Sequence, residues 1–519
     1  MKLNSFTLLF SFLVTLLVTE AIEKGDIISQ HNFDGSAEQT YWSASLGPLV
    51  QLVTTDRGNQ ALRIERNQPN GASIWATVSL PAFTLSGSKI RIRALAKAVN
   101  ISTPPKPWNG IKVMLHTQGP SGDNYLQQNQ PQGTFDWRSV DYVVGVPSDA
   151  RQATLRLGLE AVTGMVWFDD LLITVYSKPR PPPPPPATGL PYKGHNLTRL
   201  RGAMIGINLK EKDFRDFGSW NANHVRWQLM WNGFPNSPAD NGDIPAYEAW
   251  LESALQHLDS MLPVCRELGL HILVDLHTLP GGRNNESTNN LFKEKRFQDT
   301  FLSLWEKIAR RYKNESIIWG YDLANEPIEG IVPDDIMDWR DLAIATIQRI
   351  RAIDSEHAII LEGAPGGGAG ALIDLQPVPF DKIVYSFHMY QPSTFTHQNI
   401  YDDVTPISYP GVIDGKMWDK NELRLNMKRV LDWQRAYNVH IYVGEFSAIR
   451  WAPGNSAYEY LRDVIDIFEE NEWDWAYHAF REWAGWSVEH TGDKYNTQHA
   501  PIPTNRQILL MDWFKKNQH

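Results

Sequence analysis

Eight short apolar segments separated by helical patterns fill residues 192–519, and this repeat restricts the fold more than any other feature of the sequence. Between two of these segments, apolar side chains from Trp250 to Leu262 recur at the spacing of one helix face, and Gly269 follows at the expected helix end. Eight strands, most of them followed by a helix, predict a (β/α)₈ TIM barrel, with a doubly wound open sheet as the alternative. The expected strands are residues 204–208, 224–228, 271–276, 317–321, 358–361, 383–387, 440–443 and 473–477.

A proline-rich segment, residues 178–191, separates this region from the preceding part of the chain. Its six consecutive prolines favour the polyproline II conformation, which makes the segment a semi-rigid linker. Before it, residues 22–177 contain short stretches in which apolar and polar side chains alternate, with turn residues at frequent intervals. This pattern predicts an antiparallel β-sandwich as one domain and residues 192–519 as a second domain.

Residues 1–21 have the composition of a secretory signal peptide, because Lys2 precedes an apolar run over residues 6–18. A membrane anchor is the alternative, but this run is shorter than the ~20 apolar residues that a membrane-spanning helix needs. We therefore expect a secreted or periplasmic protein that has no membrane attachment after cleavage and acts as a monomer. The net charge of -10 gives no electrostatic reason to expect nucleic acid as a partner.

Polar and ionisable residues follow several of the expected strands, at the strand ends where a parallel barrel places its active site. Asn325 and Glu326 follow the buried strand at 317–321, where packing gives no reason for a polar pair. Glu445 follows the seventh strand, so two carboxylates are expected to lie at the same end of the barrel. The other polar residues expected at this end are Arg226, His277, His388 and Tyr390.

The barrel region resembles glycoside hydrolase family 5, a family of retaining barrel glycosidases. The resemblance spans residues 192–519 and rests on Asp-Leu-His after strand three, Asn-Glu-Pro after strand four, His-x-Tyr after strand six and Gly-Glu-Phe after strand seven. It implies an enzyme that hydrolyses O-glycosyl bonds, with Glu326 as the acid/base and Glu445 as the nucleophile. The substrate-binding residues that it implies are Arg226, His277, Asn325, His388, Tyr390 and a tryptophan on strand eight.

The tryptophan on strand eight is the least regular part of this resemblance. In the family, it usually stands at the strand end and forms the floor of the sugar subsite. By register, Phe480 occupies that place in this sequence, and Trp483 follows three residues later. We take Trp483 as the expected floor.

Two neighbouring carboxyl groups suit retaining hydrolysis on physical grounds. The mechanism needs carboxyl groups about 5–5.5 Å apart, one ionised to attack the anomeric carbon and one protonated to assist departure. A cationic Arg226 beside Glu445 would keep that carboxylate charged, and Tyr390 can donate a hydrogen bond to it. Such a reaction requires no metal ion and no organic cofactor.

The resemblance makes endo-β-1,4-glucanase the first expectation for the activity, on a polysaccharide or oligosaccharide substrate. The alternatives within the family are β-mannanase, xyloglucanase and exo-acting glycosidases. Two alternatives come from other functional classes. A metal-dependent hydrolase would use His277, His388 and Asp275 as zinc ligands, although the sequence has no closely spaced ligand motif. A non-catalytic carbohydrate-binding protein would be indicated by the loss of either carboxylate, and both are present.

The last expected strand of the N-terminal region, Gly164–Val175, resembles the final strand of galactose-binding-like jelly rolls. Many carbohydrate-binding modules have that fold, so the resemblance implies a carbohydrate-binding module at residues 22–177. Candidate sugar-stacking residues, for each of which core packing is the alternative, are Trp42, Trp108 and Tyr125. Candidate calcium ligands, for which a strand-end turn is the alternative, are Asp169 and Asp170.

Overall fold

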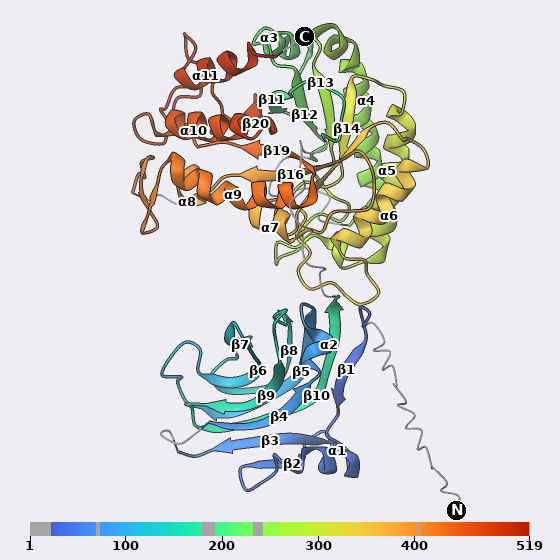
Figure 1. The fold of residues 1–519 in the computed structure, drawn as a ribbon, viewed down its shortest axis with the longest axis vertical. Coiled ribbons are helices and arrows are strands. Elements are labelled where there is room, and N and C mark those ends of the chain that lie inside the picture. The colour runs from blue at the N-terminus through green and yellow to red at the C-terminus, as the bar shows by residue number, and fades with distance from the viewer. Residues whose placement is uncertain (1–21, 69–72, 179–192, 232–241, 402–404, 518–519) are drawn as a thin grey trace, which may run out of the picture. The chain divides into compact units, whose positions relative to one another are not determined.

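The computed structural model describes residues 22–68, 73–178, 193–231, 242–401 and 405–517. The expected signal peptide and almost all of the expected linker lie outside the described residues. The chain divides into two compact units, Met1–Pro181 and Pro182–His519 (Figure 1). In the described part of the chain, no helix combines the length and the apolar character that a membrane span requires.

The N-terminal unit is an antiparallel β-sandwich. Its elements are β1 (Ile27–His31), α1 (Gly35–Trp42), β2 (Val50–Thr54), β3 (Gln60–Arg66), β4 (Ile74–Leu80), α2 (Ala82–Leu85), β5 (Lys89–Ile101), β6 (Gly110–Gly119), β7 (Gly122–Gln127), β8 (Gly133–Gly145), β9 (Gln152–Glu160) and β10 (Gly164–Ser177). One sheet has the order β2-β3-β10-β5-β8, with β1 paired to β10, and the other has the order β4-β9-β6-β7. Their alternating apolar side chains form one core, as the sequence predicts.

Trp42 and Asp169 both have roles inside this unit. The Trp42 side chain is buried in the core, and its indole N–H donates to Glu38 (Nε1–Oε2 2.8 Å), which favours the packing alternative. Asp169 is buried and accepts a hydrogen bond from Asn59 (Nδ2–Oδ2 2.6 Å). Trp108 and Tyr125, in contrast, are each 57% exposed.

The C-terminal unit is built on a closed barrel of eight strands in chain order, all paired in parallel. The strands are β11 (Arg201–Ile205), β12 (His224–Gln228), β13 (His271–Asp275), β14 (Ile318–Asp322), β15 (Ala358–Glu362), β16 (Ile383–Met389), β19 (His440–Phe446) and β20 (Asp474–Phe480). This closure confirms the TIM barrel and excludes the open sheet.

Helices cover the outside of the barrel (Figure 1). They are α3 (Glu211–Gly218), α4 (Ile244–Leu268), α5 (Lys295–Tyr312), α6 (Trp339–Arg351), α7 (Ala369–Asp374), α9 (Lys420–Tyr437), α10 (Ser456–Glu470) and α11 (Asn505–Phe514). Helix α4 shows why the sequence predicted them: Asp243 caps its N-terminus by accepting from the Ala246 N–H, and Gly269 ends it at φ 66. The connections also contain η2 (Asn290–Phe292), α8 (Ser393–Thr396) and the hairpin of β17 (Gly411–Ile413) and β18 (Lys416–Trp418).

Candidate active site

Arg226 on β12 lies at the centre of a buried polar cluster near the C-terminal ends of the barrel strands. Its guanidinium donates to Glu445 (Nη1–Oε1 2.6 Å), Asp322 (Nε–Oδ2 3.0 Å) and Glu362 (Nη2–Oε1 2.9 Å). Asp275 Oδ1 lies 3.3 Å from Nη2. Because the donors of a guanidinium are held in one plane, this single side chain fixes the orientation of several carboxylates.

Carboxylates outnumber cations in this cluster, and Asp322 has the environment of a neutral acid. Burial raises the pKa of Asp322 well above its usual value; Arg226 opposes the rise, and the charges of Glu362 and Asp275 add to it. Neither Asp322 nor Glu362 stands out in the sequence, because each is the last residue of an apolar strand.

Glu445 is buried near the end of β19 and is surrounded by donors. Besides the bond from Arg226, its Oε2 accepts a hydrogen bond from the Tyr390 hydroxyl at 2.9 Å. His478 Nδ1 lies 3.3 Å from the same oxygen, and His388 Nδ1 lies 3.7 Å from it. Burial alone would raise the pKa of Glu445, but the positive charges of His388, His478 and Arg226 outweigh burial and hold this pKa well below its usual value. Glu445 is therefore ionised in the resting protein.

Glu326 lies beside Glu445 but is more open to solvent, with 30% of its side chain exposed against 6% for Glu445. Its Oε1 lies 2.8 Å from His388 Nδ1. The backbone at Glu326 has a left-handed φ of 44, and its N–H donates to Glu362 Oε2 at 2.8 Å. A non-glycine residue in that conformation is strained, so Glu362 helps to hold the turn that presents Glu326.

His388 joins the two carboxylates through one buried imidazole. Its Nδ1 faces Glu326 and Glu445, and its Nε2 lies 3.1 Å from Glu362 Oε1. Burial lowers the pKa of His388, but the charges of Glu362 and Glu445 and the hydrogen bond to Glu326 raise it well above its usual value. His388 is therefore a cation that lies among three carboxyl groups.

Asn325 and His277 are oriented by a chain of hydrogen bonds that starts at Arg226. The Asn325 Oδ1 accepts from Arg226 Nη2 at 3.1 Å, which directs its Nδ2 toward His277 Nε2 at 3.2 Å. Since Nε2 of His277 is then the acceptor, its Nδ1–H donates to Asp275 Oδ2 at 2.8 Å. Both ring nitrogens of His277 are engaged, so a zinc ion held by His277, His388 and Asp275 would have to break these bonds.

His478 and Glu482 belong to the cluster but were not predicted from the sequence. His478 Nδ1 contacts the Tyr390 hydroxyl, and its Nε2 lies 2.7 Å from Glu482 Oε2. Burial lowers the pKa of His478, but the charges of Glu482 and Glu445 outweigh burial and raise this pKa to about 10. An imidazolium thus stands beside Glu445 at the end of β20.

A register shift in β20 explains why His478, and not Phe480, faces the cluster. Strand β11 pairs Ala203 with Tyr477 and Ile205 with Phe480, so one extra residue is inserted on β20. Such a bulge reverses the alternation of side chains along the strand. Phe480 consequently packs on Phe217, with ring centroids 4.6 Å apart, and is only 3% exposed. The expectation from register that Phe480 occupies the subsite position was wrong for this reason.

Trp483 lies on the segment after β20 and is 42% exposed. Its ring is T-shaped to Trp451 at 5.8 Å and to Trp486 at 5.6 Å. Trp486 in turn lies 6.0 Å from the Tyr390 ring and 5.6 Å from His478. Trp483 therefore reaches the polar cluster through Trp486. The remaining residues expected at this end, which the structure brings together directly, are Arg226, His277, Asn325, Glu326, His388, Tyr390 and Glu445.

The glycine-rich loop after β15 also closes against the cluster. Gly367 accepts a hydrogen bond from the His388 N–H at 2.8 Å and has a φ of 66. A Cβ at this position would lie 2.7 Å from Glu362 Oε2 and 3.3 Å from Glu326 Cγ. This loop was not among the segments expected at the site, and the close approach of Glu362 and Glu326 explains why a glycine stands here.

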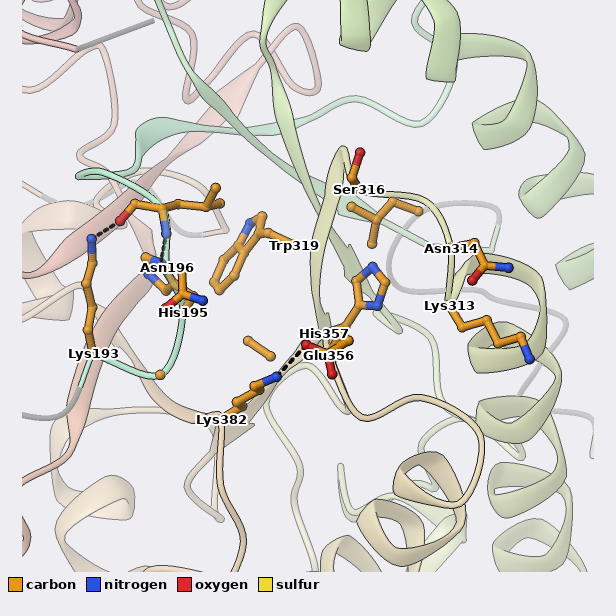
Figure 2. Close-up of a pocket in the computed structure, with 14 residues that line it drawn as sticks. Lys193, His195, Asn196, Lys313, Asn314, Ser316, Trp319, Glu356, His357 and Lys382 are labelled. Carbon is orange, nitrogen blue, oxygen red and sulfur yellow. Dashed lines mark hydrogen bonds and ion pairs between the residues drawn. The ribbon is translucent and has the colours of Figure 1, made fainter.

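A cavity of about 530 Å³ lies at the opposite end of the barrel, near the first residues of β14 and β15 (Figure 2). The residues that line it include Lys193, His195, Trp319, Glu356 and Lys382. Glu356 Oε2 is paired with Lys382 Nζ at 2.8 Å. None of the predicted site residues lines this cavity. The candidate active site is therefore identified by the paired carboxyl groups of Glu326 and Glu445, and not by this cavity.

Comparisons with known proteins agree with the barrel fold of the C-terminal unit. The sequence model of the cellulase family, glycosyl hydrolase family 5, matches residues 190–487. Endoglucanase C of Acetivibrio thermocellus is 28% identical over 288 residues, which cover 50% of this chain and 81% of that protein. Cellodextrinase A of Ruminococcus flavefaciens is 26% identical over 300 residues, which cover 53% of this chain and 84% of that protein. A crystal structure of a glycoside hydrolase has a TM-score of 0.50 at 24% identity, covers 61% of this chain and 99% of its own, and shows the likeness of fold.

Proposed function

The chain belongs to the cellulase family, glycosyl hydrolase family 5, and is therefore a glycosidase; on this premise we propose that it cleaves β-1,4-glucan with retention, by double displacement. The observation that carries retention is the spacing of the two carboxylates. One carboxylate oxygen from each of Glu326 and Glu445 and one imidazole nitrogen of His388 lie within 4.8 Å of one another. Retaining glycosidases hold their carboxyl groups about 5–5.5 Å apart, whereas inverting ones leave about 6.5–9.5 Å for a water molecule.

In the first step, Glu445 attacks the anomeric carbon, and the bond to the leaving oxygen breaks. Glu326 gives its proton to that oxygen, so the departing chain leaves as a neutral alcohol. The environments support these roles: Glu445 is buried among cations, and Glu326 is the more exposed carboxyl. The products of this step are a glycosyl ester on Glu445 and an ionised Glu326.

In the second step, Glu326 accepts a proton from water, and the resulting oxygen attacks the anomeric carbon of the ester. Once Glu445 is esterified it carries no charge, so His388 has one fewer carboxylate to balance. Its positive charge then acts more strongly on Glu326, 2.8 Å away, and stabilises the ionised form that serves as base. The ester bond breaks, Glu445 leaves as a carboxylate, and Glu326 is protonated again.

The surrounding residues position the nucleophile and the sugar. Arg226 and Tyr390 hold one oxygen each of Glu445, which aims the carboxylate at the anomeric carbon. Asn325 and His277 are oriented beside it and are proposed to bind the sugar 2-hydroxyl and line the subsite. Trp483, which is 42% exposed, offers a ring face for stacking on a neighbouring sugar unit.

His478 adds a third cation to the surroundings of Glu445, beside Arg226 and His388. Glu482 holds the imidazole from one side, and Nδ1 faces the Glu445 oxygen that Tyr390 also contacts. We assign His478 as a positioning residue that keeps Glu445 ionised and oriented. It occupies the end of strand eight, where the expected tryptophan is missing.

Exchange of Glu445 for alanine tests the mechanism. E445A should lose turnover while still binding oligosaccharide. Added azide should restore cleavage of a substrate with a good leaving group and yield the α-configured glycosyl azide, because azide then attacks from the face that the carboxylate occupied. Near wild-type activity in E445A, or a β-configured azide product, would exclude Glu445 as the nucleophile.

The proposal of an endo-β-1,4-glucanase rests on the names of the similar proteins, Endoglucanase C and Cellodextrinase A. A panel of carboxymethyl cellulose, mannan, xyloglucan and cello-oligosaccharides should show the highest rate on the cellulosic substrates. Product analysis should show a mixture of chain lengths early in the reaction. Release of a single short product from the start would indicate an exo-acting enzyme, and preference for mannan or xyloglucan would reassign the substrate.

We further propose that residues 1–21 are a signal peptide, that residues 178–191 link the two domains, and that the protein is secreted as a monomer. The N-terminal sequence of protein collected outside the producing cells should begin near Ile22. Light scattering should give a mass near that of one chain. Retention in the cell with an intact N-terminus would refute the signal peptide.

A metal-dependent hydrolase is the second candidate, because the spacing of Glu326, His388 and Glu445 also suits a metal ion. In that case a chelator should abolish activity, and a divalent cation should restore it. Full activity after exhaustive treatment with a chelator would exclude this candidate. The proposed double displacement predicts that result, since its proton transfers use protein carboxylates alone.

A further inference from the structure

The outward face of the four-stranded sheet in the N-terminal unit can be assigned from strand register. Leu115 on β6 pairs with Leu155 on β9, and both side chains are buried in the core of the sandwich. Because side chains alternate, His116 and Arg156, one residue along each strand, point away from that core. On the outer strands, Tyr125 pairs with His116, and Trp75 lies two residues before the partner of Arg156.

A continuous set of contacts crosses all four strands on this face. Arg156 lies over the Trp75 ring at 5.5 Å and donates from Nη2 to His116 Nδ1 at 2.8 Å. Since arginine can only donate, His116 Nδ1 is the acceptor, and its Nε2–H donates to Asp123 Oδ2 at 3.1 Å. The His116 ring is stacked on Tyr125, with centroids 4.7 Å apart and an interplanar angle of 9°. The other face of the Tyr125 ring is open, because the residue is 57% exposed.

A second row of contacts runs beside the first. Lys112 points outward from β6, yet its side chain is only 2% exposed, because Glu160 and Gln127 cover it. Its Nζ lies 2.9 Å from Glu160 Oε2 and 2.6 Å from Gln127 Oε1. Gln127 also donates to the main-chain carbonyl of Trp108 at 2.9 Å, which connects the Trp108 backbone to this row. The Trp108 indole is 57% exposed, and Lys106 Nζ lies over the ring, 5.1 Å from its centroid.

The charges on this face are balanced against one another, which restricts the chemistry of a ligand. Lys112 is paired with Glu160, and Asp123 is bonded through His116 to Arg156. A charged ligand would have to displace one of these partners. A neutral ligand with many hydroxyl groups could instead bond to the remaining donors and acceptors and lay its apolar ring faces on Tyr125 and Trp108.

We infer that this face binds a β-1,4-glucan chain, the same substrate class as the barrel, with Tyr125 and Trp108 as stacking platforms. This inference rests on the proposed function for the choice of glucan. The covalent link to a barrel of the cellulase family gives a reason for this occupant, because a tethered binding site raises the local concentration of the chain that the barrel cleaves. Trp75 and Arg156 form the far end of the face.

The test uses the full-length chain with E445A, so that hydrolysis does not consume the probe. Cellohexaose is titrated calorimetrically into E445A, into E445A with W108A and Y125A, and into E445A with Y41A. Tyr41 is a matched control, since it is also an exposed tyrosine, 50% exposed, whose ring contacts a histidine, His31, at 4.4 Å. It lies on α1, which is not part of the four-stranded sheet.

Two binding sites per chain are expected in E445A and in the variant with Y41A, one in the barrel and one on the sheet face. The variant with W108A and Y125A should lose one site, or bind at that site about tenfold more weakly or worse, with an unchanged unfolding temperature. Equal binding by this variant and by E445A would overturn the inference. The proposed function is tested separately, by hydrolysis with Glu445 present, so either idea can fail while the other stands.

Discussion

The two ends of the barrel carry similar sets of ionisable side chains, but the sets are in different states. At each end, one group of three side chains brings ligand atoms within 4.8 Å of one another. Each group contains histidine and carboxylate, and each is largely buried. The group near the strand starts is His195, His440 and Asp474, and the group near the strand ends is Glu326, His388 and Glu445.

In the group near the strand starts, both oxygens of the one carboxylate have hydrogen-bond donors. Asp474 Oδ2 lies 2.7 Å from Nε2 of both His195 and His440, and its Oδ1 accepts from the Leu200 N–H at 2.8 Å. Burial raises the pKa of Asp474, but the two histidines outweigh burial and hold this pKa well below its usual value. One carboxylate is thus shared by several donors, and it ties the segment before β11 to β19 and β20.

The group near the strand ends has the opposite balance, because its carboxyl groups outnumber its one imidazole. Glu326 is partly exposed, and the single imidazole of His388 contacts three carboxyl groups. Removing the charge of one carboxylate therefore changes the balance for the others, which is the property a double displacement needs. The two groups thus contain similar residue types but differ in the ratio of acids to cations.

The largest expected effect is a loss of activity when the strand-end group is changed, with no loss when the strand-start end is changed. E445A should lower kcat by about 10⁴-fold or more, since Glu445 is the proposed nucleophile. The matched control is E356A, which removes an exposed glutamate at the strand-start end, where it pairs with Lys382. Initial rates on a soluble cello-oligosaccharide should be unchanged in E356A. An equal loss in both variants would mean that the two ends are not functionally distinct.

The next largest effect is on the free energy of unfolding, and it is expected when the group near the strand starts is changed. D474N should lower the free energy of unfolding by about 3 kcal/mol or more at pH 7, because two histidines lose their buried acceptor charge. The folded pKa of Asp474 is below its ordinary value of 3.8, so its contribution is present above that pH and is lost as the pH falls through the folded pKa. Urea unfolding should therefore show a difference from wild type that shrinks in acid.

The control for this stability effect is D512N. Asp512 forms an exposed ion pair with Lys515, and 59% of its side chain is accessible. Its replacement should change the unfolding free energy by less than about 1 kcal/mol. The activity of folded D474N, per molecule, should match that of wild type. Loss of activity without loss of stability would assign Asp474 to the chemistry instead.

The sequence predicted the barrel and most of the residues that the structure brings together at one end, for an identifiable reason. Glu326 and Glu445 each follow an apolar strand, where a polar residue stands out, and the motifs around them are specific to a family. Asp322 and Glu362 end their strands without such contrast. Only the closed barrel shows that both contact Arg226.

His478 could not be predicted, because its direction depends on the bulge in β20. Simple alternation places Phe480 and His478 on the same face, and one inserted residue separates them. Pairing with β11, which decides this, joins segments that are more than 200 residues apart in the chain. The sequence could have drawn attention to the His-Ala-Phe-Arg-Glu segment by its two ionisable partners, His478 and Glu482, four positions apart.

A smaller loss of activity is expected when His478 is replaced. This replacement removes one cation near Glu445 and so tests whether the cations at the strand ends control that carboxylate. H478Q should lower kcat/KM by about 10- to 100-fold. The positive charge of His478 lowers the pKa of Glu445, so its removal should raise that pKa. The acid limb of the profile of kcat/KM against pH should then move to higher pH. A loss of activity without this movement would indicate a purely structural role.

His397 provides the control for H478Q. Its ring also contacts Tyr390, at 5.0 Å, but burial lowers the pKa of His397 and the charge of His478 lowers it further. His397 is therefore neutral at pH 7. H397Q should leave the acid limb where it is in wild type, because no positive charge is removed. A shift of equal size in both variants would show that the pH profile does not report on the charge of His478.

The smallest expected effect concerns Trp483, which lies outside the charged cluster. Because Trp483 is 42% exposed and reaches the cluster through Trp486, its ring can touch a sugar without touching the reacting atoms. W483A should raise KM for long cello-oligosaccharides by about three- to tenfold and leave kcat nearly unchanged, since uniform binding is lost. W483F, which keeps a ring, should recover part of the loss. If W483A lowered kcat as strongly as H478Q, Trp483 would act next to the reacting sugar, as the sequence analysis expected for the subsite floor.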